Sequence, residues 1–172
     1  TLAELGVPGT IVLRGEEAHR SVRFSLPLTE HVQSATLKLR YHFSPGLLPN
    51  VSHLNVSLNG TLVATLTVAP PPVVTAATVK VPLERGDAAD AFENENSPAL
   101  EASIALPAGL LVRDNDLSFE FVGHYKADCE DAANSTLWSR VDLASGIELA
   151  GTLASLPNDL RQLKETFYDP AV

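Results

Sequence analysis

The chain has little of several residue types that enzymes and nucleic-acid-binding proteins commonly use. Its 172 residues include no methionine, one cysteine and one tryptophan, and only 19% are charged. Because the first residue is not methionine, we expect a segment of a longer or processed protein, with any signal peptide or membrane anchor outside it. Cys129 cannot form an internal disulfide; a buried thiol, an intermolecular disulfide and a partner cysteine outside this segment all stay open.

Positive charge and long apolar runs are also scarce. The net charge is −9, and the 12 lysines and arginines are scattered. Nucleic-acid binding requires clustered cations, so we expect no nucleic-acid partner and no adhesion to an anionic membrane surface. No apolar run approaches the ~18–20 residues that cross a bilayer. A neutral or weakly charged ligand fits this composition best.

What the chain does contain is apolar–polar alternation with a period of two, which is typical of strands with one face on a core. About nine segments show it, with almost no helical periodicity before residue 155. This pattern predicts an antiparallel β-sandwich or barrel in residues 1–155, followed by a short non-β extension over 156–172 that we interpret as a linker. The predicted strands are 10–14, 20–26, 37–43, 54–58, 62–66, 77–83, 100–106, 117–121 and 147–153.

The best-defined segment is Leu37–Leu66, which ends in a hairpin around Asn59-Gly60. A two-residue turn would place Leu62 opposite Ser57, apolar against polar. We therefore predict a three-residue loop that pairs Val56 with Leu62, with Gly60 left-handed next to a G1 bulge.

The chain carries no recognisable catalytic motif. None of the five histidines lies in HExxH or a zinc spacing, and there is no GxSxG and no glycine-rich phosphate loop. The acidic stretch 84–98 is interpreted as a solvated insertion. We expect a non-enzyme without a metal site or cofactor.

Aromatic side chains are the remaining route to a ligand, because a sugar ring stacks its C–H face on an aromatic ring. Tyr41 follows the inward parity of its strand and is predicted to lie in the core. Trp138 faces outward if Leu137 and Ser139 face inward; otherwise it is packed inside. Tyr125 follows a strand and opens a polar loop, where ligand sites are frequent. Trp138 and Tyr125 are the candidate carbohydrate-binding residues.

A set of ordered motifs resembles one known family over nearly the whole chain. The motifs, in order, are Leu13-Arg14-Gly15, Phe24, Tyr41, Ser44-Pro45, Leu47-Leu48-Pro49, Ser52, Leu54, Leu58-Asn59, Gly123-His124-Tyr125, Cys129-Glu130, Leu137-Trp138, Asn158-Asp159-Leu160 and Phe167-Tyr168-Asp169-Pro170. In their order and approximate spacing they resemble the N-terminal domain of the periplasmic B subunit of bacterial cellulose synthase. Two features depart from that family: the insertion at 84–98, and Leu163–Thr166 before the final motif.

The resemblance implies a jelly-roll domain of carbohydrate-binding type, followed by an α/β domain that is not in this chain. It implies a periplasmic location, with the full protein held to the inner membrane by a C-terminal helix. Its partners would be the catalytic subunit, which polymerises glucose from UDP-glucose, the emerging β-1,4-glucan, and further copies of itself. In some species the two subunits are fused. The implied role is non-catalytic: to guide or weakly bind the glucan or, alternatively, to assemble the complex without binding sugar.

Members of this family often carry a cyclic di-GMP label. The receptor pattern for that dinucleotide combines an RxxxR pair with a D/N-x-S-x-x-G stretch, and Asp142–Gly146 has the wrong spacing for the second part. The net charge of −9 is also unfavourable for a dianionic ligand. We interpret the label as one that belongs to the complex.

Overall fold

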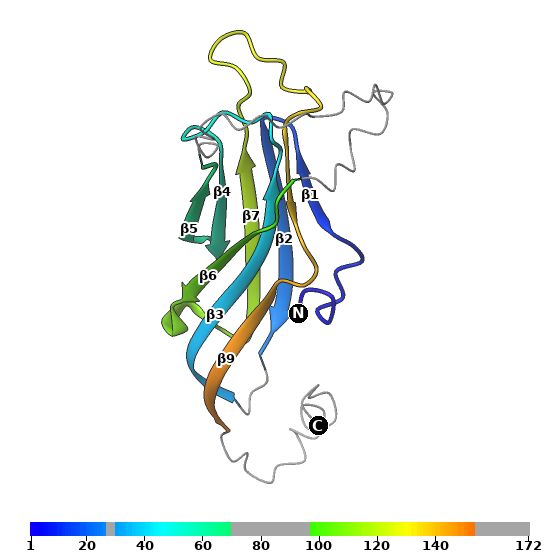
Figure 1. Ribbon diagram of the computed structural model, residues 1–172. Coiled ribbons are helices and arrows are strands. Elements are labelled where there is room, and N and C mark those ends of the chain that lie inside the picture. Colours follow the sequence, from blue (N-terminus) through cyan, green and yellow to red (C-terminus); the bar gives the residue numbers. More distant parts are fainter. Residues whose placement is uncertain (27–29, 70–96, 154–172) are drawn as a thin grey trace, which may run out of the picture.

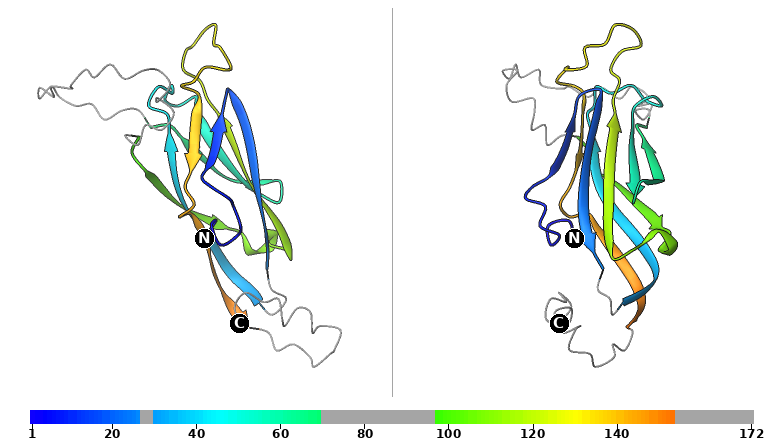
Figure 2. Two further views of the ribbon diagram at one scale, coloured as in Figure 1. Left: turned by 90° about the vertical axis from the view of Figure 1, so that its right-hand side faces the viewer. Right: turned by 180° about the vertical axis from the view of Figure 1, so that it is seen from behind.

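The computed structural model describes residues 1–26, 30–69 and 97–153, and this part is a β-sandwich of two antiparallel sheets (Figure 1). Sheet A has the order β1-β8-β3-β6, with β9 also paired to β3, and sheet B has the order β2-β7-β4-β5. Figure 2 shows the two layers from the side and from behind. The predicted all-β sandwich is confirmed. The elements are β1 (Ile11–Arg14), β2 (Glu17–Ser25), β3 (Glu30–Phe43), β4 (His53–Leu58), β5 (Thr61–Thr67), β6 (Leu100–Leu106), the short 3₁₀ turn η2 (Ala108–Leu110), β7 (Asp114–Val122), β8 (Trp138–Val141) and β9 (Gly146–Leu153).

Strand β3 organises sheet A. It pairs with β9 through residues 30–38, with β6 through residues 35–41 and with β8 through residues 41–43. Its alternation sets the two faces, because Leu37, Leu39 and Tyr41 are buried between the sheets. The predicted core position of Tyr41 is confirmed by an exposed fraction of 7%, and burial raises the pKa of its hydroxyl.

Sheet B supplies the other half of the core. Phe119 and Phe121 of β7 are fully buried, and the ring of Phe121 lies 6.4 Å from that of Phe43 across the sandwich. Burying a side chain of this size contributes about 2–3 kcal/mol by the hydrophobic effect. The polar residues of the strands therefore lie mainly on the two outer faces, although Asn115 of β7 and Ser139 of β8 are buried.

The β4–β5 hairpin differs from the predicted register. Leu58 pairs with Thr61, so the turn has two residues, Asn59 and Gly60, both with positive φ. This is the type I′ geometry that matches strand twist. The parity conflict is resolved by a bulge at Val63, so that Ala64 rather than Leu62 pairs with Val56. The predicted three-residue loop is wrong, and Leu62 is 56% exposed.

One end of the sandwich gathers three connections: the β1–β2 turn, the crossing 44–52 and the loop 123–137 (Figure 1). Backbone hydrogen bonds join them, since Leu48 N donates to His124 O at 2.7 Å and Ser44 N to Trp138 O at 3.1 Å. The side chain of Ser52 also donates to His124 O at 3.1 Å. The loop that leads into Trp138 is thereby fixed to the sandwich.

Several predictions fall outside the described residues. These are the strand 77–83, almost all of the insertion 84–98 and the linker 156–172. Cys129 is exposed, with φ +52°, so the buried alternative for its thiol is wrong.

Candidate functional site

Trp138 lies on the outer face of sheet A, at the start of β8. Its neighbours Leu137 and Ser139 are 1% and 0% exposed, and Trp138 itself is partly exposed. Across the strand pair it faces Arg14 of β1, and Arg140 follows two positions along the same face. The structure therefore places the indole outward. Of the two orientations that the sequence left open, outward or packed inside, it has the first.

Tyr125, in contrast, is partly buried against the core in the loop 123–137. Its hydroxyl accepts a hydrogen bond from Asp131 N at 3.0 Å, and Lys126 Nζ lies 5.3 Å from the ring centroid. Within the described residues, its ring makes no ring–ring contact with Trp138. The ring is occupied by structural contacts, and its role in sugar binding stays a prediction.

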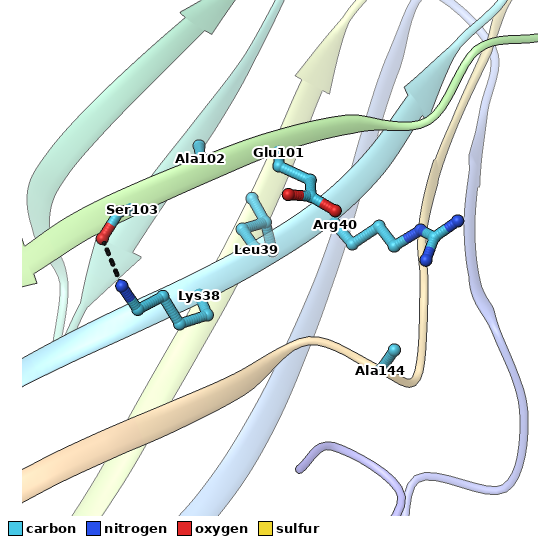
Figure 3. Close-up of a pocket in the computed structure, with 7 residues that line it drawn as sticks. All are labelled: Lys38, Leu39, Arg40, Glu101, Ala102, Ser103 and Ala144. Carbon is cyan, nitrogen blue, oxygen red and sulfur yellow. Dashed lines mark hydrogen bonds between the residues drawn. The ribbon is translucent and has the colours of Figure 1, made fainter.

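A shallow hollow of about 410 Å³ opens on the outer face of sheet A (Figure 3). Lys38 and Arg40 of β3 line it beside Glu101 and Ser103 of β6, and Ala144 closes one side. Lys38 Nζ donates to Ser103 Oγ at 3.1 Å. The hollow therefore offers hydrogen-bond donors and acceptors together, with nearly balanced charge.

Arg40 is held at the edge of the hollow by Asp142, which follows β8. The Asp142 carboxylate lies 3.3 Å from Arg40 Nε and 3.5 Å from Arg140 Nε. Arg140 Nε is buried without a hydrogen bond of good geometry, so its contact with Asp142 is an ion pair only. One carboxylate thus fixes two guanidinium groups on this face.

Asp142 also contacts His42, a buried residue with an exposed fraction of 5%. His42 Nε2 lies 3.1 Å from Asp142 Oδ2, and His42 Nδ1 lies 2.9 Å from the carbonyl oxygen of Ser97. Both ring nitrogens thus face oxygen atoms within hydrogen-bonding distance. We name the group of His42, Arg40, Arg140 and Asp142 the Asp142 cluster.

Neither the hollow nor the Asp142 cluster is predicted from the sequence. The alternation of β3 does place Lys38, Arg40 and His42 on one face. Their partners, however, come from β6 and from the β8–β9 connection, at positions that only the strand register brings together. The one feature of the sequence that could have indicated this cluster is the row of three cationic or titratable side chains on one face of β3.

The loop 123–137 is closed by Glu130. Its carboxylate accepts hydrogen bonds from the backbone N–H groups of Lys126, at 2.8 Å, and Tyr125, and it lies 2.6 Å from His124 Nδ1. The N–H of Lys126, then the His124 side chain and the N–H of Tyr125, lower the pKa of Glu130. The carboxylate is therefore ionised at neutral pH and shapes the loop.

One part of the cyclic di-GMP pattern needs correction. Residues 55–60, NVSLNG, do fit D/N-x-S-x-x-G, and the structure places them in β4 and its turn. The side chain of Asn55 is bonded there to Glu120 and Thr65. The sequence holds no RxxxR pair, so the full pattern is still incomplete.

None of the helical segments in the described ranges has the length and apolar character needed for a bilayer crossing.

Comparison with known proteins gives a consistent family. The family described as "Cellulose synthase BcsB, first CBM domain" matches residues 1–92 and 88–153. A "Cyclic di-GMP-binding protein" of Xanthomonas axonopodis pv. citri is 37% identical over 98% of this chain and 18% of its own length. The Escherichia coli K12 protein of that name is 32% identical over 95% of this chain and 18% of its own length. "Cellulose synthase 2" of Novacetimonas hansenii is 28% identical over 99% of this chain and 9% of its own length. The chain thus spans less than a fifth of the length of these relatives.

Proposed function

The chain belongs to the family of the first CBM domain of cellulose synthase BcsB, and on this premise we propose that it is a non-catalytic accessory module of a bacterial cellulose synthase complex. Its task is to bind weakly and guide the emerging β-1,4-glucan in the periplasm. The catalytic subunit of the complex is its partner, and the membrane attachment lies in another part of the protein.

The observation that carries the proposal is the outer face of sheet A. Trp138 faces outward there, and an indole can stack on the apolar C–H face of a pyranose ring. On the same sheet, the hollow beside Glu101 and Ser103 offers acceptors and donors for sugar hydroxyls. Because Lys38 is paired with Glu148, and Arg40 and Arg140 are paired with Asp142, a neutral polyol suits this face better than a phosphorylated ligand.

Titration with cellohexaose tests the proposal. Trp138 is the only tryptophan, so its fluorescence reports directly on this face. We expect saturable quenching at millimolar ligand or below, and no response to a matched α-1,4-linked maltohexaose.

Variants extend the test, with ligand-observed NMR as a readout that does not need the indole. Trp138→Ala should weaken cellohexaose binding about tenfold, since stacking on an aromatic ring contributes on the order of 1–1.5 kcal/mol. Leu62→Ala, an exposed position on sheet B, is the control and should bind as the parent chain does. If the parent chain is silent at millimolar ligand, the proposal is wrong. Self-association in sedimentation would then support the alternative of an assembly module.

A further inference from the structure

Three side chains with metal-ligating groups meet where the loop 123–137 joins the sandwich. Glu16, His124 and Glu130 each offer one ligand atom, and these atoms all lie within 4.8 Å of one another. All three residues are partly buried. Glu16 comes from the β1–β2 turn, whereas His124 and Glu130 come from the loop 123–137, so the fold is needed to bring the third residue to the other two.

The backbone around the three residues is held in place before any ligand binds. Glu16 N donates to Ala132 O at 3.3 Å, and Gly123 N donates to Glu16 O at 2.9 Å. His124 N donates to Ser52 Oγ at 3.0 Å. The first two bonds tie the β1–β2 turn to Gly123 and Ala132 of the loop, and the third ties the loop to the crossing 44–52. Such preorganisation lowers the cost of binding.

The role of Glu130 in closing the loop explains only part of this arrangement. Glu130 is ionised and bonded to His124, as described above. Glu16, however, has no side-chain hydrogen bond among the described residues, although its carboxylate approaches that of Glu130 within 4.8 Å. Two carboxylates this close repel each other unless a cation lies between them. The position of Glu16 is therefore the observation that points to a ligand.

We propose that Glu16, His124 and Glu130 bind one divalent transition-metal ion of the Zn²⁺ type. One imidazole nitrogen and two carboxylate oxygens are a ligand set that Zn²⁺ accepts, with water in the remaining position. Ca²⁺ and Mg²⁺ prefer oxygen ligands alone and are excluded by the imidazole. The ion locks the loop 123–137 to the β1–β2 turn, and this loop leads directly into Trp138.

The experiment uses the chain without a histidine tag, stripped with chelator and titrated with Zn²⁺ in a calorimeter. We expect one equivalent to bind and the melting temperature to rise with Zn²⁺ concentration, because the ion binds only the folded chain. Co²⁺ bound in place of Zn²⁺ should give the visible absorption of a four-coordinate, tetrahedral site. Ca²⁺ at the same concentration should give neither heat nor a shift in melting temperature.

Matched variants assign the site. Glu16→Gln removes a ligand charge but leaves the hydrogen bonds of Glu130 intact, and it should weaken Zn²⁺ binding about tenfold or more. Glu17→Gln, at the exposed neighbouring position of β2, should bind as the parent chain does. Cys129→Ser should also bind normally, because the proposed site does not include the thiol. The proposal is overturned by a parent chain that binds no Zn²⁺, by unchanged binding in Glu16→Gln, or by loss of binding in Cys129→Ser. None of these outcomes depends on whether the chain binds glucan.

Discussion

The two outer faces of the sandwich use their polar residues differently. On sheet B the contacts join neighbouring exposed strands: Asn55 donates to Glu120 at 3.2 Å and accepts from Thr65 at 2.8 Å. On sheet A one carboxylate, Asp142, joins two arginines and the buried His42.

The difference is one of burial. On the outer face of sheet B, Asn55, Thr65 and Glu120 stay accessible to water, where an exposed charged contact contributes about 0–1 kcal/mol. The Asp142 cluster includes the buried side chain of His42, and losing a partner of a buried group costs much more. Sheet A therefore has an outer face on which side chains are held in defined positions, as a binding site requires.

The largest expected effect comes from breaking the Asp142 cluster. Asp142→Ala leaves His42 Nε2 without its acceptor and the buried Arg140 Nε without its counter-ion. We expect a loss of about 2–3 kcal/mol in the free energy of unfolding, measured by equilibrium urea denaturation. Glu120→Ala on sheet B is the matched change and should cost at most about 1 kcal/mol. Equal losses would show that burial does not distinguish the two faces.

An intermediate effect on stability is expected at the β4–β5 turn of sheet B. Asn59 has φ +50°, donates from Nδ2 to Leu110 O at 2.7 Å, and accepts from Asp116 N at 2.8 Å. Asn59→Ala should cost about 1–2 kcal/mol in thermal or urea unfolding, because it loses these hydrogen bonds and strains a left-handed position. Asn59→Gly loses the same side-chain hydrogen bonds but places no strain on the left-handed backbone, so it should cost less than Asn59→Ala. If the two variants are equally stable, the left-handed backbone is unimportant here.

The smallest expected effect concerns ligand affinity rather than stability. Glu101→Gln in the hollow should weaken cellohexaose binding about threefold, since one acceptor loses its charge. Glu120→Gln makes the same change at a strand interior of sheet B and should leave the affinity unaltered. Ligand-observed NMR measures both. If Glu120→Gln lost more affinity than Glu101→Gln, the glucan site would have to lie on sheet B.

Much of the fold follows from side-chain alternation alone. The period of two in β3 places Tyr41 in the core and Lys38 on the outer face, and both positions agree with the structure. The parity of Leu137 and Val141 likewise turns Trp138 outward. Burial of the apolar side chains on one face of a strand determines these positions. The alternation that shows it lies within a few consecutive residues, so it can be seen in the sequence.

What could not be predicted depends on how strands pair. The sequence predicts that an extra residue in the turn brings the apolar faces of β4 and β5 into register. In the structure the extra residue is instead the bulge at Val63. Ser139 is a polar residue with no exposure, because its hydroxyl donates to His42 O at 3.0 Å. Asp142 and Ser97 reach His42 from positions 100 and 55 residues away. Contacts of this kind follow from the register between distant strands, which a single sequence does not display.

The triple pairing of β3 has a kinetic consequence. Its partners β6, β8 and β9 all lie at least 55 residues further along the chain. Each pairing of β3 therefore requires the closure of a long loop, at a cost in conformational entropy. Chains dominated by such distant pairings fold slowly, in milliseconds to seconds. Once formed, the middle of β3 is bonded on both edges, and its amides can open only when most of sheet A opens with them. We therefore expect the amides in the middle of β3 to be among the last to exchange their hydrogens with water.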